Sequence, residues 1–263
     1  MALLNLLLFL LWLGVPVSSM SLQKRVVNGH NCNDNERQYH VKIIGSNSTH
    51  EFLCGGSLIS NEWILTAAHC WEPGWSITAT IGIHPIGAIR ETRAITHHEI
   101  YKDSHGKDHD IMLLKLPKKT RIQPIQLTDC QTPLPVGTTV QIAGFGPGIA
   151  GPNNKRIDDT PSNLLCGNMK IEDPKIVAAM RKSGKDDYSH QYWNCARSST
   201  TDTSEGDSGG GWVYQDKLYG VHAFTGDPDY ACSEPAGFMD VCAYKPWIEN
   251  IIKKRKSLCL GCG

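Results

Sequence analysis

The chain has 263 residues, and its 26 basic and 26 acidic side chains give a formal net charge of zero. This balance gives no electrostatic reason to expect binding to nucleic acid or to a membrane surface. Ten cysteines favour an oxidising compartment. The composition is ordinary for a globular protein, and the length suits one large all-β domain or two small barrels.

The first predicted element is a secretory leader at residues 1–19. A leucine-rich run is followed by the small residues Val17, Ser18 and Ser19. The apolar core is too short to span a membrane comfortably, whereas small residues after such a core are typical of a signal-peptidase site. No later stretch is long and apolar enough to cross a bilayer. We therefore expect a secreted protein, extracellular or held in a secretory granule.

Short apolar runs bounded by Gly, Pro, Asn or Asp follow the leader and predict β-strands. These runs are residues 39–44, 58–66, 111–116, 140–143 and 218–221. Near the end of the chain, Pro246 precedes apolar residues at helical spacing, which predicts a helix that starts at Pro246. The expected fold class is all-β and antiparallel, with a C-terminal α-helix.

Three segments carry residue types suited to covalent catalysis. Ser208 lies among glycines, where the backbone can bend sharply and amides can converge on an oxygen, although such a segment alone is also typical of a surface turn. His69 and Asp110 precede it in the chain. A serine hydroxyl is a poor nucleophile at neutral pH, so it needs an imidazole to take its proton and a carboxylate to orient that imidazole.

Together, Thr66–Cys70, Asp110–Leu116 and Glu205–Gly210 resemble the corresponding segments of the trypsin and chymotrypsin family of serine proteases. The resemblance covers residues 26–252. It implies two six-stranded antiparallel β-barrels, joined near residues 120–131, with the active site in the cleft between them.

The resemblance also implies a role for each catalytic group. His69 would be the general base and acid, Asp110 its orienting carboxylate, and Ser208 the nucleophile. The amides of Gly206 and Ser208 would form the oxyanion hole.

Activation by cleavage is a further implication. Residues 20–25 would form a propeptide ending in the basic pair Lys24 and Arg25, a pair that could otherwise be a surface feature. In this family the chain is cut at the equivalent position, here after Arg25, and the new amino group of Val26 inserts beside Asp207. A buried carboxylate is costly unless it is paired, so this ion pair can hold the oxyanion loop in its working shape.

Asp202 matches the pocket-floor aspartate by which trypsin holds Arg or Lys. The resemblance therefore implies cleavage after these residues. The pocket walls depart from the trypsin pattern, because Thr225 and Ala236 stand where two glycines leave room for the substrate, and Ala223 and Phe224 stand where Ser and Trp are usual. A pocket narrowed in this way could slow cleavage, shift the preference toward Lys, or exclude the basic side chain of the substrate altogether.

Six of the cysteines match bridges of the family, namely Cys32–Cys166, Cys54–Cys70 and Cys130–Cys242. Four remain: Cys195, Cys232, Cys259 and Cys262. Trypsin has a cysteine where this chain has Ser204 and another near Val140, so two of its bridges cannot form here. Among three pairings, we prefer a bridge between Cys195 and Cys232, because both fall on loops near the expected pocket.

Several other motifs have ordinary interpretations. Gly144–Gly148 resembles a phosphate loop, but no helix pattern follows it, so a turn is expected. The histidines of residues 97–109 match no common zinc spacing, and the stretch at the family's calcium loop offers only Glu91, so neither metal nor other cofactor is expected. Asn47 begins a sequon on a polar loop and is a predicted glycosylation site.

Residues 253–263 form a basic tail that contains Cys259 and Cys262 and continues beyond the usual end of a trypsin-like chain. These cysteines could close a local loop, pair with Cys195 or Cys232, or link two molecules as a dimer. The basic residues complement a helix dipole, and the alternative is a docking patch for sulfated glycan.

We therefore predict a secreted, zymogen-activated serine endopeptidase that hydrolyses peptide bonds through an acyl-enzyme, after Arg or Lys. Its partners would be protein or peptide substrates and protein inhibitors. The alternative is a protease-like binding protein that keeps the fold without efficient turnover. The intact triad and Gly206 favour the enzyme, whereas the altered pocket and the tail favour the alternative.

Overall fold

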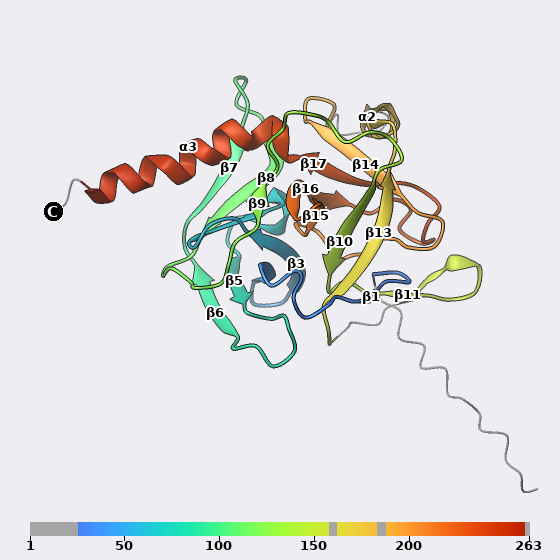
Figure 1. Ribbon diagram of the computed structural model, residues 1–263, viewed down its shortest axis with the longest axis horizontal. Coiled ribbons are helices and arrows are strands. Elements are labelled where there is room, and N and C mark those ends of the chain that lie inside the picture. Colours follow the sequence, from blue (N-terminus) through green and yellow to red (C-terminus); the bar gives the residue numbers. More distant parts are fainter. Residues whose placement is uncertain (1–25, 158–161, 183–187, 261–263) are drawn as a thin grey trace, which may run out of the picture.

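Two β-sheets contain most of the strands (Figure 1). The structure is a computed structural model in which residues 26–157, 162–182 and 188–260 are described. The expected leader, the propeptide with Arg25, and Cys262 lie outside these residues, as does the tail beyond residue 260.

The first sheet comes from the N-terminal half, in the order β6-β5-β2-β3-β4-β8-β7. Its strands are β2 (His40–Ser46), β3 (Glu51–Leu58), β4 (Trp63–Thr66), β5 (Ser76–Ile81), β6 (Glu91–Ile95), β7 (His98–Lys102) and β8 (Asp108–Lys115). Buried and part-exposed residues alternate along β2 and β5, because one face of the curled sheet covers the core.

The second sheet has the order β1-β13-β10-β15-β16-β17-β14, and β13 also pairs with β14. The strands are β1 (His30–Asn31), β10 (Thr139–Gly144), β13 (Leu165–Ile171), β14 (Trp193–Arg197), β15 (Gly211–Tyr214), β16 (Lys217–Phe224) and β17 (Ala236–Asp240). The extra pairing closes β13, β10, β15, β16, β17 and β14 into a six-stranded barrel. The predicted fold class is confirmed, with the first half as a curled sheet rather than a closed barrel.

The segment expected to join the two halves contains β9 (Gln126–Leu127), which pairs in parallel with β16 of the second sheet. One predicted strand, residues 58–66, is wrong as a single element. The chain leaves β3 at Leu58 and starts β4 only at Trp63, because the Ser60 hydroxyl accepts hydrogen bonds from the amides of Glu62 and Trp63 and closes a turn.

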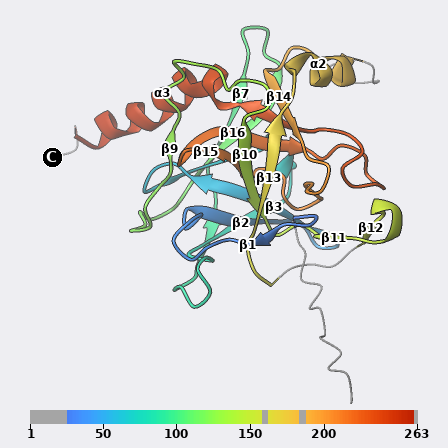
Figure 2. The same cartoon turned by 45° about the vertical axis from the view of Figure 1, so that its right-hand side comes forward.

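Helices and a small hairpin lie outside the sheets. Within the described residues, the α-helices are α2 (Pro174–Lys182) and α3 (Val241–Leu260), and the short 3-10 helices are η2 (Ala68–Cys70) and η3 (Pro152–Asn154). The hairpin of β11 (Ile149–Ala150) and β12 (Arg156–Ile157) projects beside the second sheet (Figures 1 and 2). No helix among the described residues is both long and apolar enough to cross a membrane.

The start predicted for the C-terminal helix is wrong, since α3 begins at Val241 and Pro246 lies inside it. Proline removes one backbone donor there. The buried side chains of Tyr244 and Ile248 pack on the core of the first sheet from either side of Pro246, and this burial favours the continuous helix. Side chains beyond Lys253 are not described, so the expectations of a dimer or a glycan patch at the tail lie outside the described part of the chain.

Candidate active site

His69 and Asp110 lie side by side where β4 ends and the adjacent strand β8 begins. His69 is in η2, which directly follows β4, and Asp110 is in β8, which pairs with β4. Nδ1 of His69 is 2.8 Å from Oδ2 and 3.0 Å from Oδ1 of Asp110, and the His69 amide donates to Oδ1 at 2.9 Å. A ring that donates from Nδ1 carries its basic lone pair on Nε2.

The Asp110 carboxylate is suited to hold this tautomer. Burial alone would raise its pKa, but the attraction of His69 and hydrogen bonds from the His69 and Ala68 amides outweigh burial and lower the pKa. The backbone amide of Asp110 donates to Oε1 of Gln191 at 2.9 Å, which anchors β8 at this point. The carboxylate is therefore ionised at neutral pH and can stabilise an imidazolium.

Ser208 lies in a loop that packs against the residues just before η2. Its carbonyl accepts a hydrogen bond from the Gly55 amide at 2.7 Å, and the Gly209 amide donates to the carbonyl of His222 at 2.7 Å. A Cβ on Gly209 would lie 2.1 Å from Oγ1 of Thr66, and its φ of +80° is left-handed, so only glycine suits this position. This close approach brings the nucleophile loop to the segment that carries His69.

Asp207 is completely buried beside the nucleophile. Its carboxylate accepts hydrogen bonds from the amides of Gly146 (2.8 Å) and Ser204 (2.9 Å). Burial raises its pKa to about 6 despite these bonds. A Cβ on Gly144 would lie 1.9 Å from the Asp207 carboxylate, so the glycines of this segment allow the carboxylate to approach the backbone.

The N-terminal residues of the expected mature chain lie beside the pocket-floor segment. Val26 is buried, and its side chain lies against Gly167 of β13. Val27 pairs with Asp202 in an isolated antiparallel bridge, in which the Asp202 amide donates to the Val27 carbonyl at 3.1 Å. These contacts belong to the uncleaved chain, in which Val26 carries no free ammonium group.

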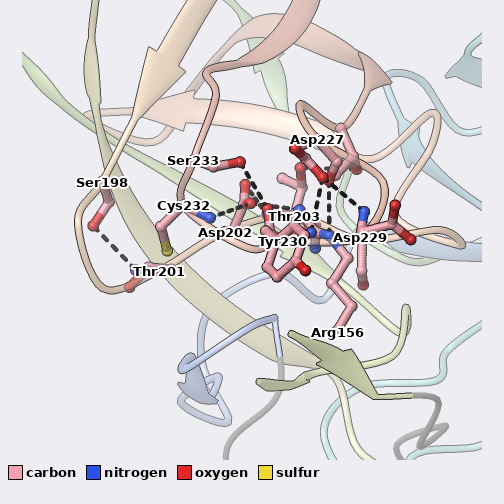
Figure 3. A network of polar contacts seen from close by, with 12 residues as sticks. Arg156, Ser198, Thr201, Asp202, Thr203, Asp227, Asp229, Tyr230, Cys232 and Ser233 are labelled. Carbon is pink, nitrogen blue, oxygen red and sulfur yellow. Dashed lines mark hydrogen bonds and ion pairs between the residues drawn. The ribbon is translucent and has the colours of Figure 1, made fainter. Parts of the chain in front are cut away.

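Asp202, the expected specificity residue, is only 1% exposed and is already paired. Its Oδ2 accepts from Nη2 of Arg156 at 2.6 Å and from the Cys232 amide at 2.8 Å, and its Oδ1 accepts from the Thr203 amide at 2.8 Å (Figure 3). Burial raises the pKa of Asp202 against these interactions. Sequence reasoning missed Arg156, because no local pattern connects it to an aspartate 46 residues later.

The two expected wall residues occupy different surroundings. Oγ1 of Thr225 lies 3.0 Å from Oγ1 of Thr203, the residue next to Asp202, so Thr225 does lie near the pocket floor. Ala236 is fully buried in β17, opposite Ala196, and belongs to the hydrophobic core of the closed barrel.

A cleft of about 420 Å³ lies beside the catalytic pair. Its lining includes His69 and Asp110, together with the aromatic side chains of Tyr188, Trp193 and Phe224. The rings of Trp193 and Phe224 meet edge to face with centroids 5.7 Å apart. Such a surface can bury apolar side chains of an extended peptide next to the reacting groups.

His222 is a second residue that sequence reasoning missed. It lies in β16, is fully buried, and has no hydrogen-bond partner on either ring nitrogen among the described residues. Burial, with a smaller contribution from the nearby His69, lowers its pKa to about 3. The ring packs on Trp212 with centroids 5.9 Å apart. It is therefore a neutral packing group behind the triad.

This burial predicts a loss of stability in acid. The folded-state pKa of His222 is depressed from 6.5 to about 3, so the unfolded chain takes up a proton first as the pH falls below 6.5. Stability is full above pH 6.5 and falls by about 1.4 kcal/mol per pH unit below it, or about 2 kcal/mol between pH 6.5 and pH 5. We expect His222→Val to remove this loss of about 2 kcal/mol in the free energy of unfolding, measured by urea denaturation at pH 6.5 and pH 5.

The control for this measurement is His105→Asn, since the His105 side chain is 81% exposed. It should keep the wild-type difference between the two pH values. Burial also lowers the pKa of His40 to about 3. His40 should therefore contribute equally to the pH dependence of the unfolding free energy in both variants. An unchanged slope in His222→Val would contradict the assignment.

The three disulfides implied by the family resemblance are present: Cys32–Cys166, Cys54–Cys70 and Cys130–Cys242. The expected bridge between Cys195 and Cys232 is wrong, because both are free thiols. Sγ of Cys195 in β14 lies 3.7 Å from the Asp173 carbonyl, near α2, whereas Cys232 lies beside Asp202. Burial raises the pKa of both thiols to about 11, so neither is a reactive thiolate at neutral pH.

Two remaining expectations concern metals and glycosylation. Among the described residues, the one group of potential metal ligands is Cys54, His69 and Cys70, and both of its cysteines are joined in a disulfide. Asn47 lies on the exposed loop between β2 and β3, where its side-chain oxygen accepts hydrogen bonds from the amides of Thr49 and His50.

A curled sheet, a closed barrel and a His–Asp pair beside a glycine-flanked serine define a serine protease of the chymotrypsin fold. Residues 26–248 match the family model described as Trypsin. Human kallikrein-8 is 30% identical over 264 residues, covering 93% of this chain and 94% of that protein. The chain therefore belongs to the trypsin family of serine proteases.

Other relatives give the same result. Snake venom serine protease KN13 of Trimeresurus stejnegeri is 30% identical over 236 residues, covering 86% of this chain and 87% of the relative. The solved structure titled "Structure of GrC" matches 86% of this chain and 99% of its own, with a TM-score of 0.72 and 22% identity, and shows the shared fold.

Proposed function

We propose that this serine endopeptidase is secreted, is activated by cleavage after Arg25, and cleaves proteins or peptides after Arg or Lys. The observation that carries the catalytic part is the His69–Asp110 pair, joined at 2.8 Å, with Sγ of the adjacent Cys70 lying 3.8 Å from the Ser208 carbonyl. The proposed organisation is a leader at residues 1–19, a propeptide at 20–25, the catalytic domain at 26–252 and the basic tail at 253–263.

The catalytic cycle follows from these groups. Oγ of Ser208 attacks the carbonyl carbon of the scissile bond while Nε2 of His69 takes the hydroxyl proton, and Asp110 stabilises the imidazolium. His69 then passes the proton to the leaving amine, and water attacks the acyl-enzyme in the reverse sense. The amides of Gly206 and Ser208 are the proposed donors to the oxyanion, and the φ of +92° at Gly206 supports a specialised backbone there.

Asp202 supports the preference for a basic residue before the scissile bond. A buried carboxylate attracts a cation more strongly than an exposed one, because little water screens it. The hydroxyls of Thr203 and Thr225 lie 3.0 Å apart beside this carboxylate and add polar groups that suit a charged side chain.

The surroundings of Asp207 support activation by cleavage. Its carboxylate is buried, and its pKa is raised to about 6, so a cation brought beside it would relieve an unfavourable charge. The ammonium group of Val26, formed by cleavage after Arg25, is the proposed cation. The exposed Asn47 and three disulfides in turn support passage through the secretory route.

A fluorophosphonate probe tests the catalytic proposal, because it labels only a serine that is activated by its base and faces a formed oxyanion site. The cleaved protein should be labelled at Ser208, and His69→Ala should not be labelled. The rival, a protease-like binding protein, predicts no labelling of either form.

A peptide library then reports the residue before each cleaved bond, and Asp202→Ser should lower kcat/KM for Arg and Lys far more than for apolar residues. The pocket is not specific for basic residues if the enzyme that retains Asp202 prefers Phe, Leu or Ala both with Arg156 in place and with Arg156 replaced.

A further inference from the structure

Arg156 binds the floor of the specificity pocket through its whole guanidinium group (Figure 3). Nη2 is 2.6 Å from Oδ2 of Asp202, Nη1 is 2.6 Å from the Thr203 carbonyl, and Nε is 3.0 Å from the Asp227 carbonyl. Only 15% of the Arg156 side chain is exposed. One of these bonds goes to the carboxylate and two go to backbone carbonyls, and hydrogen bonds from a charged guanidinium are stronger than those between neutral groups.

The backbone that carries Arg156 is anchored to the same region. The Arg156 amide donates to the Asp229 carbonyl at 2.9 Å, and the Ala231 amide donates to the Asn154 carbonyl at 2.9 Å. Between these two bonds, Lys155 forms an antiparallel bridge with Tyr230. The β11–β12 hairpin thus adds a short strand to the loop at residues 227–231 and directs Arg156 at Asp202.

The receiving loop is itself held in shape. Oδ1 of Asp227 accepts hydrogen bonds from the amides of Asp229 (2.8 Å) and Tyr230 (2.9 Å). The Ser233 hydroxyl donates to the Tyr230 carbonyl at 3.0 Å. Both sides of the contact are therefore built from backbone hydrogen bonds as well as from the ion pair.

These contacts are the ones that a substrate's basic side chain would need. The carboxylate of Asp202 is the buried anion expected to hold it, and the Thr203 carbonyl is an adjacent acceptor. While Arg156 is bound, a second cation would enter a site whose charge is already neutralised. A buried cation without its own counterion is strongly disfavoured.

We propose that Arg156 is a specificity-determining residue that acts as an internal competitor for Asp202. It suppresses cleavage after Arg and Lys, and this activity rises when the β11–β12 hairpin is displaced from the pocket floor. The inference rests on the proposed function, in which Asp202 binds the basic side chain of the substrate.

The test compares Arg156→Gln with Lys155→Gln in the cleaved enzyme. Both changes remove one positive charge from the same hairpin, but Lys155 is exposed, whereas Arg156 pairs with Asp202. With peptides that differ only in the residue before the scissile bond, Arg156→Gln should raise kcat/KM for Arg about a hundredfold and change that for Ala less than about threefold. Lys155→Gln should match the wild type with both peptides.

The gain should depend on Asp202. The double variant Asp202→Ser, Arg156→Gln should lose the added activity on the Arg peptide. An equal gain in Lys155→Gln, no gain in Arg156→Gln, or a gain that survives in the double variant would each overturn the proposal.

A binding measurement separates this inference from the catalytic proposal. Benzamidine carries an amidinium cation, and its binding can be measured by calorimetry in the Ser208→Ala background, where no turnover is required. Adding Arg156→Gln should tighten the Kd of benzamidine by tenfold or more. A tighter benzamidine Kd without fluorophosphonate labelling of the protein that retains Ser208 would reject the endopeptidase proposal and keep the proposal that Arg156 competes for Asp202. An unchanged Kd would reject the proposal that Arg156 competes for Asp202.

Discussion

The cleaved Ser208→Ala variant is expected to lose about a millionfold in kcat while keeping its fold. Members of a nucleophile–base–carboxylate triad act as a unit, so removal of either the nucleophile or the base costs roughly this factor. The 2.8 Å contact between His69 and Asp110 serves no purpose in acyl transfer without a hydroxyl to activate. The measurement is hydrolysis of a peptide substrate under single-turnover and steady-state conditions.

His69→Ala should show a loss of the same order, and the double variant should be no worse than either single variant. Ser199→Ala, on an exposed loop, is the matched control and should retain full activity. All variants should unfold at the same urea concentration within experimental error. Activity of Ser208→Ala within tenfold of the wild type would remove Ser208 from the mechanism.

The second large effect concerns activation. Arg25→Gln is expected to yield a protein that remains almost inactive, because the Val26 ammonium is never formed. Asp207→Asn should be inactive even after cleavage, since the new ammonium would then lack its buried anionic partner. The Asp207 carboxylate accepts hydrogen bonds from the amides of Gly146 and Ser204. Loss of the carboxylate should therefore also loosen the loop that shapes the oxyanion site.

Amino-terminal sequencing should find Val26 first in the active form and should find no such terminus in Arg25→Gln. Lys24→Gln is the control, because it removes a neighbouring positive charge and leaves Arg25 in place. Equal peptidase activity of the cleaved and uncleaved wild type would show that cleavage after Arg25 does not activate the enzyme.

The sequence could point to candidate catalytic residues because their requirements are local. Ser208 needs glycines around it so that the loop can approach Thr66 without a Cβ, and these glycines are visible in the sequence. The fold class was predictable because alternating apolar runs bounded by turn residues are a local signature of strands. The break between β3 and β4 was missed, although the polar residues Ser60, Asn61 and Glu62 interrupt the run and the Ser60 side chain closes the turn.

The sequence by itself predicted the serine endopeptidase class, because the residues proposed as nucleophile, base and carboxylate each stand in a short segment whose composition suits that role. Only the tertiary structure decided what surrounds them. The pairing of Asp202 with Arg156, the separation of Cys195 from Cys232, and the burial of His222 depend on which strands and loops pack together. Contacts between segments far apart in the chain leave no periodic or local signal, so charge pairing and solvent exclusion become visible only when the two sheets and their loops are assembled.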